Sequence, residues 1–345
     1  MPALAIADAL RAEGTEVEFF GGERAEAELV PAAGYPFHEL AVRGIDRRNP
    51  LKALRAMLLA LRATARARKL LRQIGADVVI GGGGYVAGPV GLAARTLRLP
   101  LVLTEADSHL GIANRLLARM AKRVFLAFPL EGRDGGRYEV VGRPIPAATL
   151  GADAAAARER FGIGADERCL LVFGGSLGAR RVNEATLEAF GAGAPFAVLH
   201  ACGRRDYDDL AQRLAELGAP PHYHLHAYIQ PFADALAAAD LTVARSGGSV
   251  FEVAAAGIPA ILVPYPHATA DHQTLNARHI VSGGAAVVVS DAELDGPRLA
   301  REVGALLADE NRLRAMGHAA RSLARPDAAE QIAREVLALG EGRGK

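Results

Sequence analysis

The residues best placed to do chemistry are a glycine turn and the two polar side chains after it. An apolar run, Leu241–Ala244, predicts a buried strand, and a Ser-Gly-Gly turn (246–248) follows it at once. A glycine turn that opens a helix can hold a phosphate with backbone N–H groups and the helix dipole. Ser249 and Glu252 then allow two interpretations. They form an S-x-x-E capping box, or Glu252 accepts hydrogen bonds from a ribose diol.

Two more glycine turns have the same strand–turn–helix setting. The strand Leu170–Phe173 precedes the turn GGSLG at 174–178, and the strand Asp77–Ile80 precedes GGGG at 81–84. One such turn is weak evidence for nucleotide binding. Three turns at three strand ends indicate a cleft lined from two domains.

A polar loop follows the predicted strand Ile261–Val263. Ligands of open α/β sheets bind at the carboxyl ends of the strands, where this loop lies. The side chains that could read a polar ligand such as a sugar are those of His267, Asp271, His272 and Gln273. The alternative is an ordinary surface loop in which Asp271 caps the next helix.

Three other signals favour structural roles. Histidines alternate along 221–226, which favours a polar sheet edge over a zinc site. The acidic run at 206–209 resembles a D-x-D metal motif, but it precedes a helical pattern, which favours helix capping. Ser176 has no base and acid partners in the order of a hydrolase triad. We therefore expect no metal and no hydrolase chemistry.

Short β-rich runs alternate with helical stretches along the whole chain, which predicts an α/β fold with parallel sheets flanked by helices. The other predicted strands are Leu101–Thr104, Val124–Ala127, Phe196–His200 and Ala260–Val263. Prolines 144 and 146 mark a linker, so the predicted domains are 1–146 and 147–326. We expect residues 327–345 to form a C-terminal helix that packs back on the first domain.

The chain opens on a helical pattern, Pro2–Leu10, which leads into a short strand before Gly21. In α/β folds such a helix normally follows a strand and a phosphate-binding turn. By analogy with the second half, we expect both upstream of Met1, which would then be an internal methionine. That strand would be central in the sheet, so without it we expect unpaired strand edges.

Composition narrows the class of protein. A chain of 345 residues suits two domains, and a formal charge of +1 gives no electrostatic reason to expect nucleic acid. Cys169 and Cys202 lie in apolar runs, as buried thiols of a reducing compartment do. No apolar run approaches the roughly 18–20 residues of a membrane span, and the N-terminus has no basic signal-peptide region. These features predict a soluble cytoplasmic protein.

The segment Asn49–Ile74 differs from the rest in charge, with seven basic residues and no acidic one between Lys52 and Arg72. Its apolar stripe consists of Leu51, Leu54, Leu58 and Leu61. Such a helix either packs its leucines on the sheet or lies on an anionic membrane surface. We favour the membrane, with contacts from Lys52, Arg55, Leu58 and Arg62.

With these motifs placed, the chain resembles the MurG family, transferases that add N-acetylglucosamine to lipid I and so make lipid II. The resemblance runs from Met1 to about Gly340. Six motifs carry it: GGYVAGP (83–89), TEADSHLGIANRLLA (104–118), VVGRPI (140–145), GGSLGAR (174–180), RSGGSVFEVAAAG (245–257) and PYPHATADHQTLNA (264–277).

The resemblance implies a GT-B fold, two Rossmann-like domains facing a cleft, and an inverting mechanism with no metal or other cofactor. It places the donor, UDP-N-acetylglucosamine, mainly on the C-terminal domain. The implied donor contacts are Gly175 and Ser176 for the diphosphate, Ile229 for the uracil, Gly248, Ser249 and Val250 for the α-phosphate, Glu252 for the ribose, and His272 and Gln273 for the sugar.

On the acceptor side the resemblance implies Gly84, Tyr85, Glu105 and Asn114. The family's usual catalytic histidine lies in a loop with no counterpart here, so the base stays unassigned, with Glu105 and Asp107 as the remaining candidates. The arginine often found after the G-x-P motif is replaced by Pro146.

The expected function is inverting transfer of N-acetylglucosamine from UDP-N-acetylglucosamine to the 4-hydroxyl of the N-acetylmuramyl group of lipid I, for peptidoglycan synthesis. The expected partners are these two substrates and an anionic membrane surface, without nucleic acid. The expected location is the cytoplasmic face of the plasma membrane, as a peripheral protein. Two alternatives stay open: a catalytically impaired UDP-sugar-binding module, and a GT-B transferase with another acceptor.

Overall fold

The computed structural model describes residues 2–23, 25–42, 50–174, 179–268 and 271–342, with side chains described from residue 55 onward in the helix that starts at Pro50. The chain divides into two compact units. Unit 1 holds Met1–Pro146 together with Pro326–Lys345, and unit 2 holds Ala147–Arg325. The units therefore adjoin along the chain between Pro146 and Ala147 and between Arg325 and Pro326.

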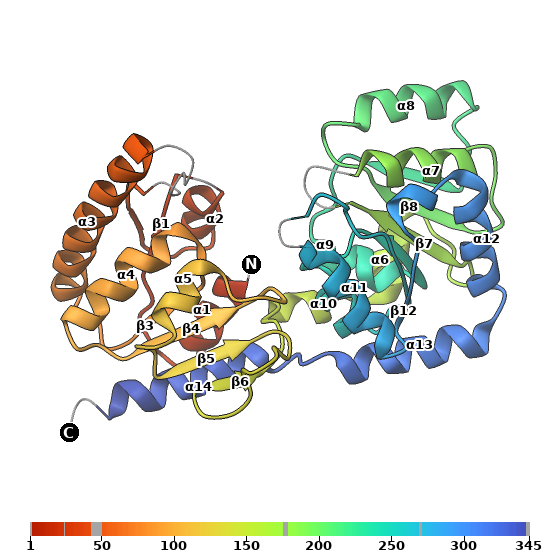
Figure 1. Cartoon of the computed structure of the whole chain (residues 1–345). Helices are drawn as coiled ribbons and strands as arrows, with labels where there is room; N and C mark the ends of the chain where they lie inside the picture. Colours follow the sequence, from red (N-terminus) through yellow and green to blue (C-terminus); the bar gives the residue numbers. More distant parts are fainter. Residues whose placement is uncertain (1, 24, 43–49, 175–178, 269–270, 343–345) are drawn as a thin grey trace. The chain divides into compact units, whose positions relative to one another are not determined.

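Unit 1 is an α/β unit whose sheet is in two pieces (Figure 1). Its elements are α1 (Pro2–Ala12), β1 (Phe19–Gly21), α2 (Glu26–Ala32), β2 (Phe37–Glu39), α3 (Pro50–Gln73), β3 (Val79–Gly81), α4 (Gly84–Thr96), β4 (Leu101–Glu105), α5 (Ile112–Leu117), β5 (Arg123–Leu126), β6 (Tyr138–Val140) and α14 (Ala328–Glu341). Strands β1 and β2 form one parallel pair, and β3-β4-β5-β6 form a parallel sheet. Among the described residues, β1, β2, β3 and β6 are each paired with a strand on one side only.

Strand β4 is buried on both faces, which is why it reads as a continuous apolar run. Leu101 and Leu103 join a core with α3, α4 and α5, whereas Val102 points to the opposite face and joins a core with α1 and α14. Helix α14 packs against α1 there, with Ile332 completely buried. The C-terminal helix is thus part of the core of unit 1.

Unit 2 contains one sheet with the strand order β12-β11-β10-β7-β8-β9, all parallel. Its elements are η1 (Ala147–Leu150), α6 (Ala154–Phe161), β7 (Cys169–Phe173), α7 (Arg180–Phe190), β8 (Ala197–Ala201), α8 (Tyr207–Glu216), β9 (Tyr223–His226), α9 (Phe232–Ala238), β10 (Leu241–Ala244), α10 (Val250–Ala256), β11 (Ala260–Leu262), α11 (His272–Ser282), β12 (Ala286–Val288), η3 (Asp291–Glu293), α12 (Gly296–Leu307) and α13 (Glu310–Leu323). Both units are Rossmann-like, as the GT-B resemblance predicts.

The order of these strands decides which face each helix covers. From β7 the chain moves outward through β8 to β9, and later from β10 outward through β11 to β12 in the opposite direction. Because parallel crossovers are right-handed, helices that follow opposite directions cover opposite faces of the sheet. Helix α7 accordingly packs with α12, while α9 packs with α6 and α10 packs with α13 (Figure 1).

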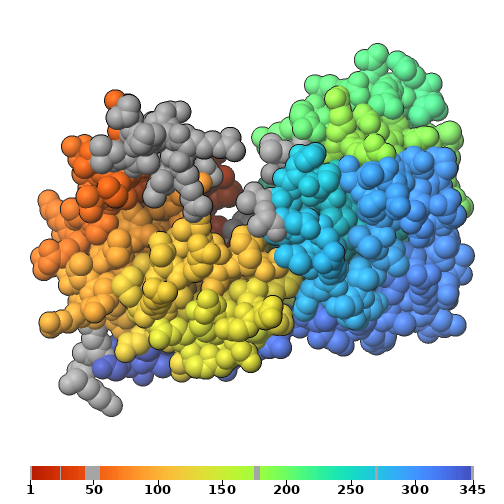
Figure 2. Space-filling view, viewed as in Figure 1, coloured from red at the N-terminus to blue at the C-terminus, as the bar shows by residue number. Residues whose placement is uncertain are grey.

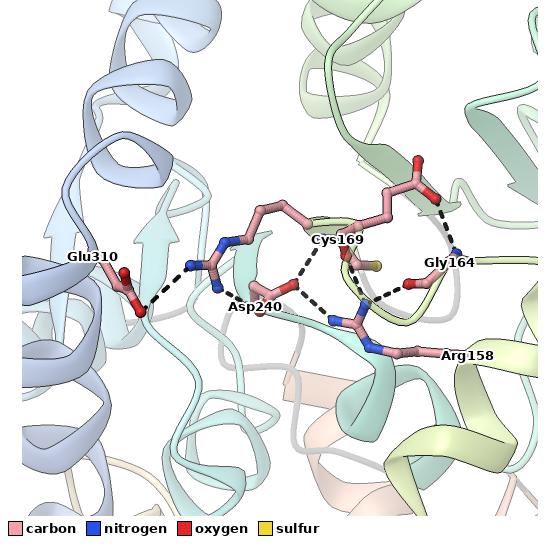
Figure 3. A network of polar contacts seen from close by, with 7 residues as sticks. Arg158, Gly164, Cys169, Asp240 and Glu310 are labelled. Atoms are coloured by element: carbon pink, nitrogen blue, oxygen red, sulfur yellow. Dashed lines mark hydrogen bonds and ion pairs between the residues drawn. The ribbon is translucent and has the colours of Figure 1, made fainter.

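The amino ends of the unit 2 strands are joined by Asp240, which directly precedes β10 (Figure 3). Its carboxylate accepts the backbone N–H of Cys169 at 2.8 Å, and ion pairs join it to Arg158 at 2.8 Å and Arg168 at 3.1 Å. Arg168 also lies 4.0 Å from Glu310 on α13. One carboxylate therefore ties the starts of β7 and β10 to α6, at the end of the sheet away from the glycine turns.

Helix α3 exposes leucines that, from the sequence alone, could have packed in the core. Its core contacts come from Ala56, Ala63, Ala67 and Leu71, which recur at helical spacing. Leu58 and Leu61 are 50% and 62% exposed, so these leucines do not pack on the sheet. Within the described part of the chain, none of the helices combines the length and the apolar character that crossing a membrane requires.

Candidate functional site

The carboxyl ends of β7 and β10 meet at the point in unit 2 where the strand order reverses. Phe173 lies opposite Ala244 in the register, so the segments that follow these two residues start side by side. Ligands of open α/β sheets bind outside such a switch point. The turn after β10 and the first residue of the turn after β7, Gly174, lie there, whereas the predicted contacts Gly175 and Ser176 fall outside the described residues.

The turn after β10 is locked to helix α11 by two buried side chains. The hydroxyl of Ser246 donates to the backbone carbonyl of Gln273 at 2.7 Å, and Nδ2 of Asn276 donates to the carbonyl of Ser246 at 3.0 Å. Both side chains are almost completely buried. The glycine turn and the start of α11 therefore form one rigid corner.

Gln273 has its side-chain orientation fixed in this corner. Its Oε1 accepts the backbone N–H of Tyr265 at 2.9 Å. Because the oxygen is used in this way, the NH2 group is the end that can donate to a ligand. His272 precedes it as the first residue of α11, partly exposed. The structure thus brings both predicted sugar contacts to the same strand ends as the glycine turn.

Arg245 is a residue of this corner to which the sequence analysis gave no role. Its guanidinium donates to the carbonyls of Val263 and Pro264, at 3.2 and 3.3 Å, and pairs with Asp291 at 2.5 Å. It also lies over the ring of Tyr265. A lone arginine ahead of a glycine turn was the available signal, but a partner in η3 could not be read from the sequence.

Helix α10 begins without the capping box that the sequence allowed. Ser249 occupies the N-cap position with a helical backbone, and its side chain makes no capping hydrogen bond. Glu252 lies in the first turn and is partly buried. The N–H of Val250 donates to the carbonyl of Gly247 at 3.3 Å. The amides of Gly248 and Ser249, which precede the helix, are therefore better placed to donate to an anion than that of Val250.

Ile229, the predicted uracil contact, is buried in the connection from β9 to α9. The next helix starts at Phe232, whose ring packs edge-on against Phe173 with the centroids 5.0 Å apart. Phe173 is the last residue of β7, so the connection lies at the same edge of the sheet. The described donor-site candidates are thus gathered at the carboxyl end of one sheet.

In unit 1, Glu105 organises the loop between β4 and α5. Its carboxylate accepts the backbone N–H of Gly111 at 2.8 Å, Nδ2 of Asn114 at 3.0 Å and, more weakly, the N–H of Asp107 at 3.3 Å. Asn114 is fully buried and also donates to the carbonyl of Thr104 at 3.0 Å. A carboxylate with both oxygens engaged is poorly placed to take a proton from a ligand. Of the two candidate bases, Asp107 is the more accessible.

The glycine turn before α4 lies against this loop. Gly83 has φ +83°, a conformation that favours glycine, and a Cβ at this position would lie 3.5 Å from Nδ2 of Asn114. Gly84 follows with φ +73°, and Tyr85 is largely exposed. The four acceptor-side candidates therefore lie on neighbouring elements of unit 1: Gly84 and Tyr85 begin α4, Glu105 ends β4, and Asn114 lies in α5.

The basic helix presents the side chains proposed for membrane contact to solvent. Arg55, Leu58 and Arg62 are exposed, and the side chain of Lys52 lies outside the described residues. Helix α3 packs beside α4, and α4 packs beside α5. The neighbouring helices add exposed Leu92, Ile112 and Leu116, and Figure 2 shows the α4–α5 part of unit 1 at the surface in orange to yellow.

The signals that favoured structural roles are mostly accounted for. Strand β9 carries the alternating histidines and is the edge strand of its sheet, as predicted. The acidic run starts helix α8 with Asp206 at the N-cap position, but the Asp206 carboxylate makes no capping hydrogen bond and accepts Nδ2 of Asn183 at 3.0 Å. Cys169 and Cys202 are buried free thiols, and burial raises the pKa of Cys169 to about 12. The described residues contain no cluster of His, Cys, Asp or Glu that could hold a metal ion.

Two family models match the chain. The glycosyltransferase family 28 N-terminal domain matches residues 1–126, and the glycosyltransferase family 28 C-terminal domain matches residues 169–332. Together they cover the strand ends of both units described above.

Curated relatives match the chain over nearly its whole length. A protein of Aeromonas hydrophila subsp. hydrophila is 41% identical over 345 residues, covering 99% of this chain and 94% of the relative. A protein of Salinibacter ruber is 42% identical over 350 residues, covering 99% and 93%. Both are named UDP-N-acetylglucosamine–N-acetylmuramyl-(pentapeptide) pyrophosphoryl-undecaprenol N-acetylglucosamine transferase.

A solved structure agrees with these relatives. The crystal structure of Acinetobacter baumannii MurG is 31% identical, with a TM-score of 0.77, and the match covers 98% of this chain and 95% of that one.

Proposed function

The chain belongs to glycosyltransferase family 28, and from that premise we propose that it transfers N-acetylglucosamine from UDP-N-acetylglucosamine to N-acetylmuramyl-(pentapeptide) pyrophosphoryl-undecaprenol, lipid I, giving lipid II. The observation that carries this proposal is the identity of about 41% with transferases of that name across both units. The shared name favours transfer over a UDP-sugar-binding module without activity.

The donor binds at the carboxyl ends of the unit 2 strands in this proposal. The amides of Gly248 and Ser249, and the turn at 174–178, hold the diphosphate, and Glu252 accepts from the ribose hydroxyls. The support for these roles is the corner locked by Ser246 and Asn276, which keeps the turn rigid. A rigid set of donors stabilises charge without reorganising during the reaction.

The uracil and the sugar lie on either side of the diphosphate in the same proposal. The backbone of Ile229 reads the uracil, and His272 with the NH2 group of Gln273 holds the sugar hydroxyls. The engaged oxygen of Gln273 supports this orientation, because only its amide donors remain for a ligand.

The acceptor binds on unit 1 in this proposal, against the start of α4 with Gly84 and Tyr85 and against the β4–α5 segment with Glu105 and Asn114. Its 4-hydroxyl attacks the anomeric carbon from the face opposite UDP, which inverts the configuration, and UDP leaves with an additional negative charge. Helix amides and dipoles of unit 2 stabilise that charge, so the reaction as proposed uses no metal. A base must take the hydroxyl proton, and Asp107 is a better candidate than the engaged Glu105.

Attachment to an anionic membrane surface completes the proposal, at the cytoplasmic face of the plasma membrane. The support is the exposed apolar side chains of α3 beside its basic residues, since an apolar stripe flanked by arginines is typical of helices that lie on lipid.

Transfer of labelled N-acetylglucosamine from its UDP donor to a lipid I analogue tests the reaction. We expect labelled lipid II, and no product when the acceptor lacks the N-acetylmuramyl 4-hydroxyl. Binding of UDP without product would support the binding-module alternative. Product only with another glycolipid would support a different acceptor.

Membrane contact has its own test, co-sedimentation with vesicles that contain anionic lipid. Replacing Leu58 and Leu61 together by Glu should lower vesicle binding about tenfold or more, because each substitution would place a charged carboxylate against the lipid. Leu217→Glu is the matched control, an equally exposed leucine at the end of α8 in unit 2. Equal binding by both variants would contradict the assignment of α3.

A further inference from the structure

A network of hydrogen bonds lies buried beside the first turn of α7. His200 in β8 is completely buried, with Nδ1 2.8 Å from the hydroxyl of Tyr223 and Nε2 3.1 Å from Oδ1 of Asn183. Nδ2 of Asn183 in turn donates to the carbonyl of Cys202 at 2.9 Å and to the carboxylate of Asp206 at 3.0 Å. These residues come from α7, β8, β9 and the start of α8.

For every hydrogen bond in this network, the donor and the acceptor can be assigned. Both acceptors that face Nδ2 of Asn183 are oxygens, so the amide cannot be flipped, and its Oδ1 must face His200. Burial lowers the pKa of His200 to about 3, so the ring is neutral and has one donor and one acceptor. Nε2 therefore donates to Asn183, and Nδ1 accepts from Tyr223.

The hydrogen-bond network ends at an ionised group, the carboxylate of Asp206. Arg205 holds Asp206 with two hydrogen bonds, of 2.8 and 2.9 Å, and these bonds lower the pKa of the Asp206 carboxyl. Because all the members are satisfied in one arrangement only, the network specifies a single position of Asn183 relative to the end of β8.

Asn183 lies in the first turn of α7, directly after the glycine turn at 174–178. Its backbone N–H closes the first turn on the carbonyl of Ala179 at 2.9 Å. On another side, Arg181 in the same turn donates to the carbonyls of Leu294 and Ala292, both at 3.1 Å. Two side chains, those of Asn183 and Arg181, thus tie the start of α7 to different segments of unit 2.

We propose that Asn183 is a positioning residue for the donor diphosphate, and that the network of His200, Tyr223 and Asp206 sets the place of the α7 N-terminus through it. The inference rests on the proposed donor site, because it assumes that amides at the start of α7 bind the diphosphate. Such amides are effective only when aimed at the oxygens, since hydrogen bonds weaken steeply with angle. The uridine part of the donor does not depend on α7 in this proposal.

The ratio of UDP affinity to uridine affinity therefore reports on the diphosphate contacts. A general loss of stability should not change this ratio. We would measure the affinities of UDP and of uridine by calorimetry, on the full chain and at a temperature where each variant is folded. Asn183→Leu should lower the ratio of UDP affinity to uridine affinity about tenfold, with uridine affinity unchanged.

Thr186→Val is the matched control. Thr186 is as buried as Asn183 and lies one turn later in α7; among the described residues, its hydroxyl bonds to the carbonyl of Val182 in its own helix, at 2.7 Å. It should lose stability without a change in the affinity ratio. An equal fall of the ratio in Thr186→Val, or a parental ratio in Asn183→Leu, overturns the proposal.

Two variants of Asp206 keep the test valid if Asn183→Leu does not fold. Asp206→Asn keeps an oxygen for the Asn183 amide and should retain most of the UDP preference. Asp206→Leu removes that acceptor and should lose the preference about tenfold. Identical ratios in the two variants contradict the inference. A parent chain that binds UDP no better than uridine overturns the donor site itself, and this inference with it.

Discussion

Gln273 shows how one backbone contact decides what a side chain can do. A glutamine beside a histidine in a polar loop was visible in the sequence, and it suggested contact with a sugar. Which end of the amide faces the ligand was not visible, because the N–H that engages its oxygen belongs to Tyr265, in the same loop but eight residues away. The type of residue was thus predictable and its orientation was not.

Gln273→Glu tests that orientation. The variant keeps an oxygen for the Tyr265 N–H but replaces the NH2 group by a second oxygen of a charged carboxylate. We expect the KM for UDP-N-acetylglucosamine to rise about tenfold with little change in melting temperature, because the contact within the loop is retained. Initial rates against donor concentration measure it. Parental KM in this variant would show that the NH2 group does not contact the donor.

His200 predicts a pH dependence of stability. Its folded pKa is about 3, below the ordinary value of about 6.5, so the unfolded chain binds a proton in the range between these values and the folded chain does not. Stability therefore falls as pH drops below about 6.5 and stops falling from this source near pH 3. Between pH 7.5 and 5.5 this one group should cost about 1.4 kcal/mol.

Urea denaturation of the parent and of His200→Gln at both pH values isolates that contribution. The glutamine does not titrate, so the variant should lose about 1.4 kcal/mol less than the parent on acidification. Other groups titrate in both chains and cancel in the difference. The same pH dependence in the two chains would refute the assigned source.

At the scale of the element, the loop from β4 to α5 is built around Glu105. The structure gives this carboxylate a role in the fold, whereas the sequence left it as a candidate base. Its two oxygens accept hydrogen bonds from two loop amides and from Asn114. The conformation of the loop therefore depends on a side chain that only accepts hydrogen bonds at this position. A catalytic role and a structural role predict different outcomes for one substitution.

Glu105→Gln should lower stability by about 2 kcal/mol, since an NH2 group would face donors where the carboxylate accepts, and charge-assisted bonds are lost. Thermal unfolding measures this loss, and steady-state kinetics measures kcat in the remaining folded protein. Asp107→Asn is the control from the same loop. A variant at 105 that melts like the parent but has no measurable kcat would favour Glu105 as the base.

Predictions at this scale succeeded where burial decides the pattern. Strands β4, β7, β8, β10 and β11 are covered on both faces, so they read as apolar runs and were placed within a residue or two. Strands β2, β6 and β12 are short and partly exposed, and no run of that kind marks them. In α3 the helix was predictable, but not that Ala56, Ala63 and Ala67 face the core while Leu58 and Leu61 face outward.

At the scale of the whole molecule, the site depends on the order of strands in space. The sequence placed the glycine turn after β10, and the polar loop after β11, at strand ends. It did not show that β10 lies between β7 and β11, an order that brings three segments far apart in the chain to one edge. Strand order follows from packing of the completed domain, which no local pattern encodes.

The return of α14 to unit 1 makes a prediction about which unit a mutation weakens. Ile332 is completely buried against α1 and the sheet of unit 1, so Ile332→Ala should cost about 3 kcal/mol. Hydrogen exchange followed by mass spectrometry should show faster exchange in α1 and β4 and parental exchange in β7 and β10. Arg334→Ala, on the exposed side of the same helix, is the control. Faster exchange confined to unit 2 would refute the assignment.

Helix α14 also sets an order of events during synthesis. The ribosome completes all of unit 2 before it makes residues 328–341, so unit 1 emerges first yet must wait for its last core element. Nascent domains generally fold in the order in which they leave the ribosome. Here the later unit can finish first, while one face of the earlier unit, the one that carries Ile6, Leu10 and Phe125, remains uncovered. That interval is when this chain most needs protection by chaperones.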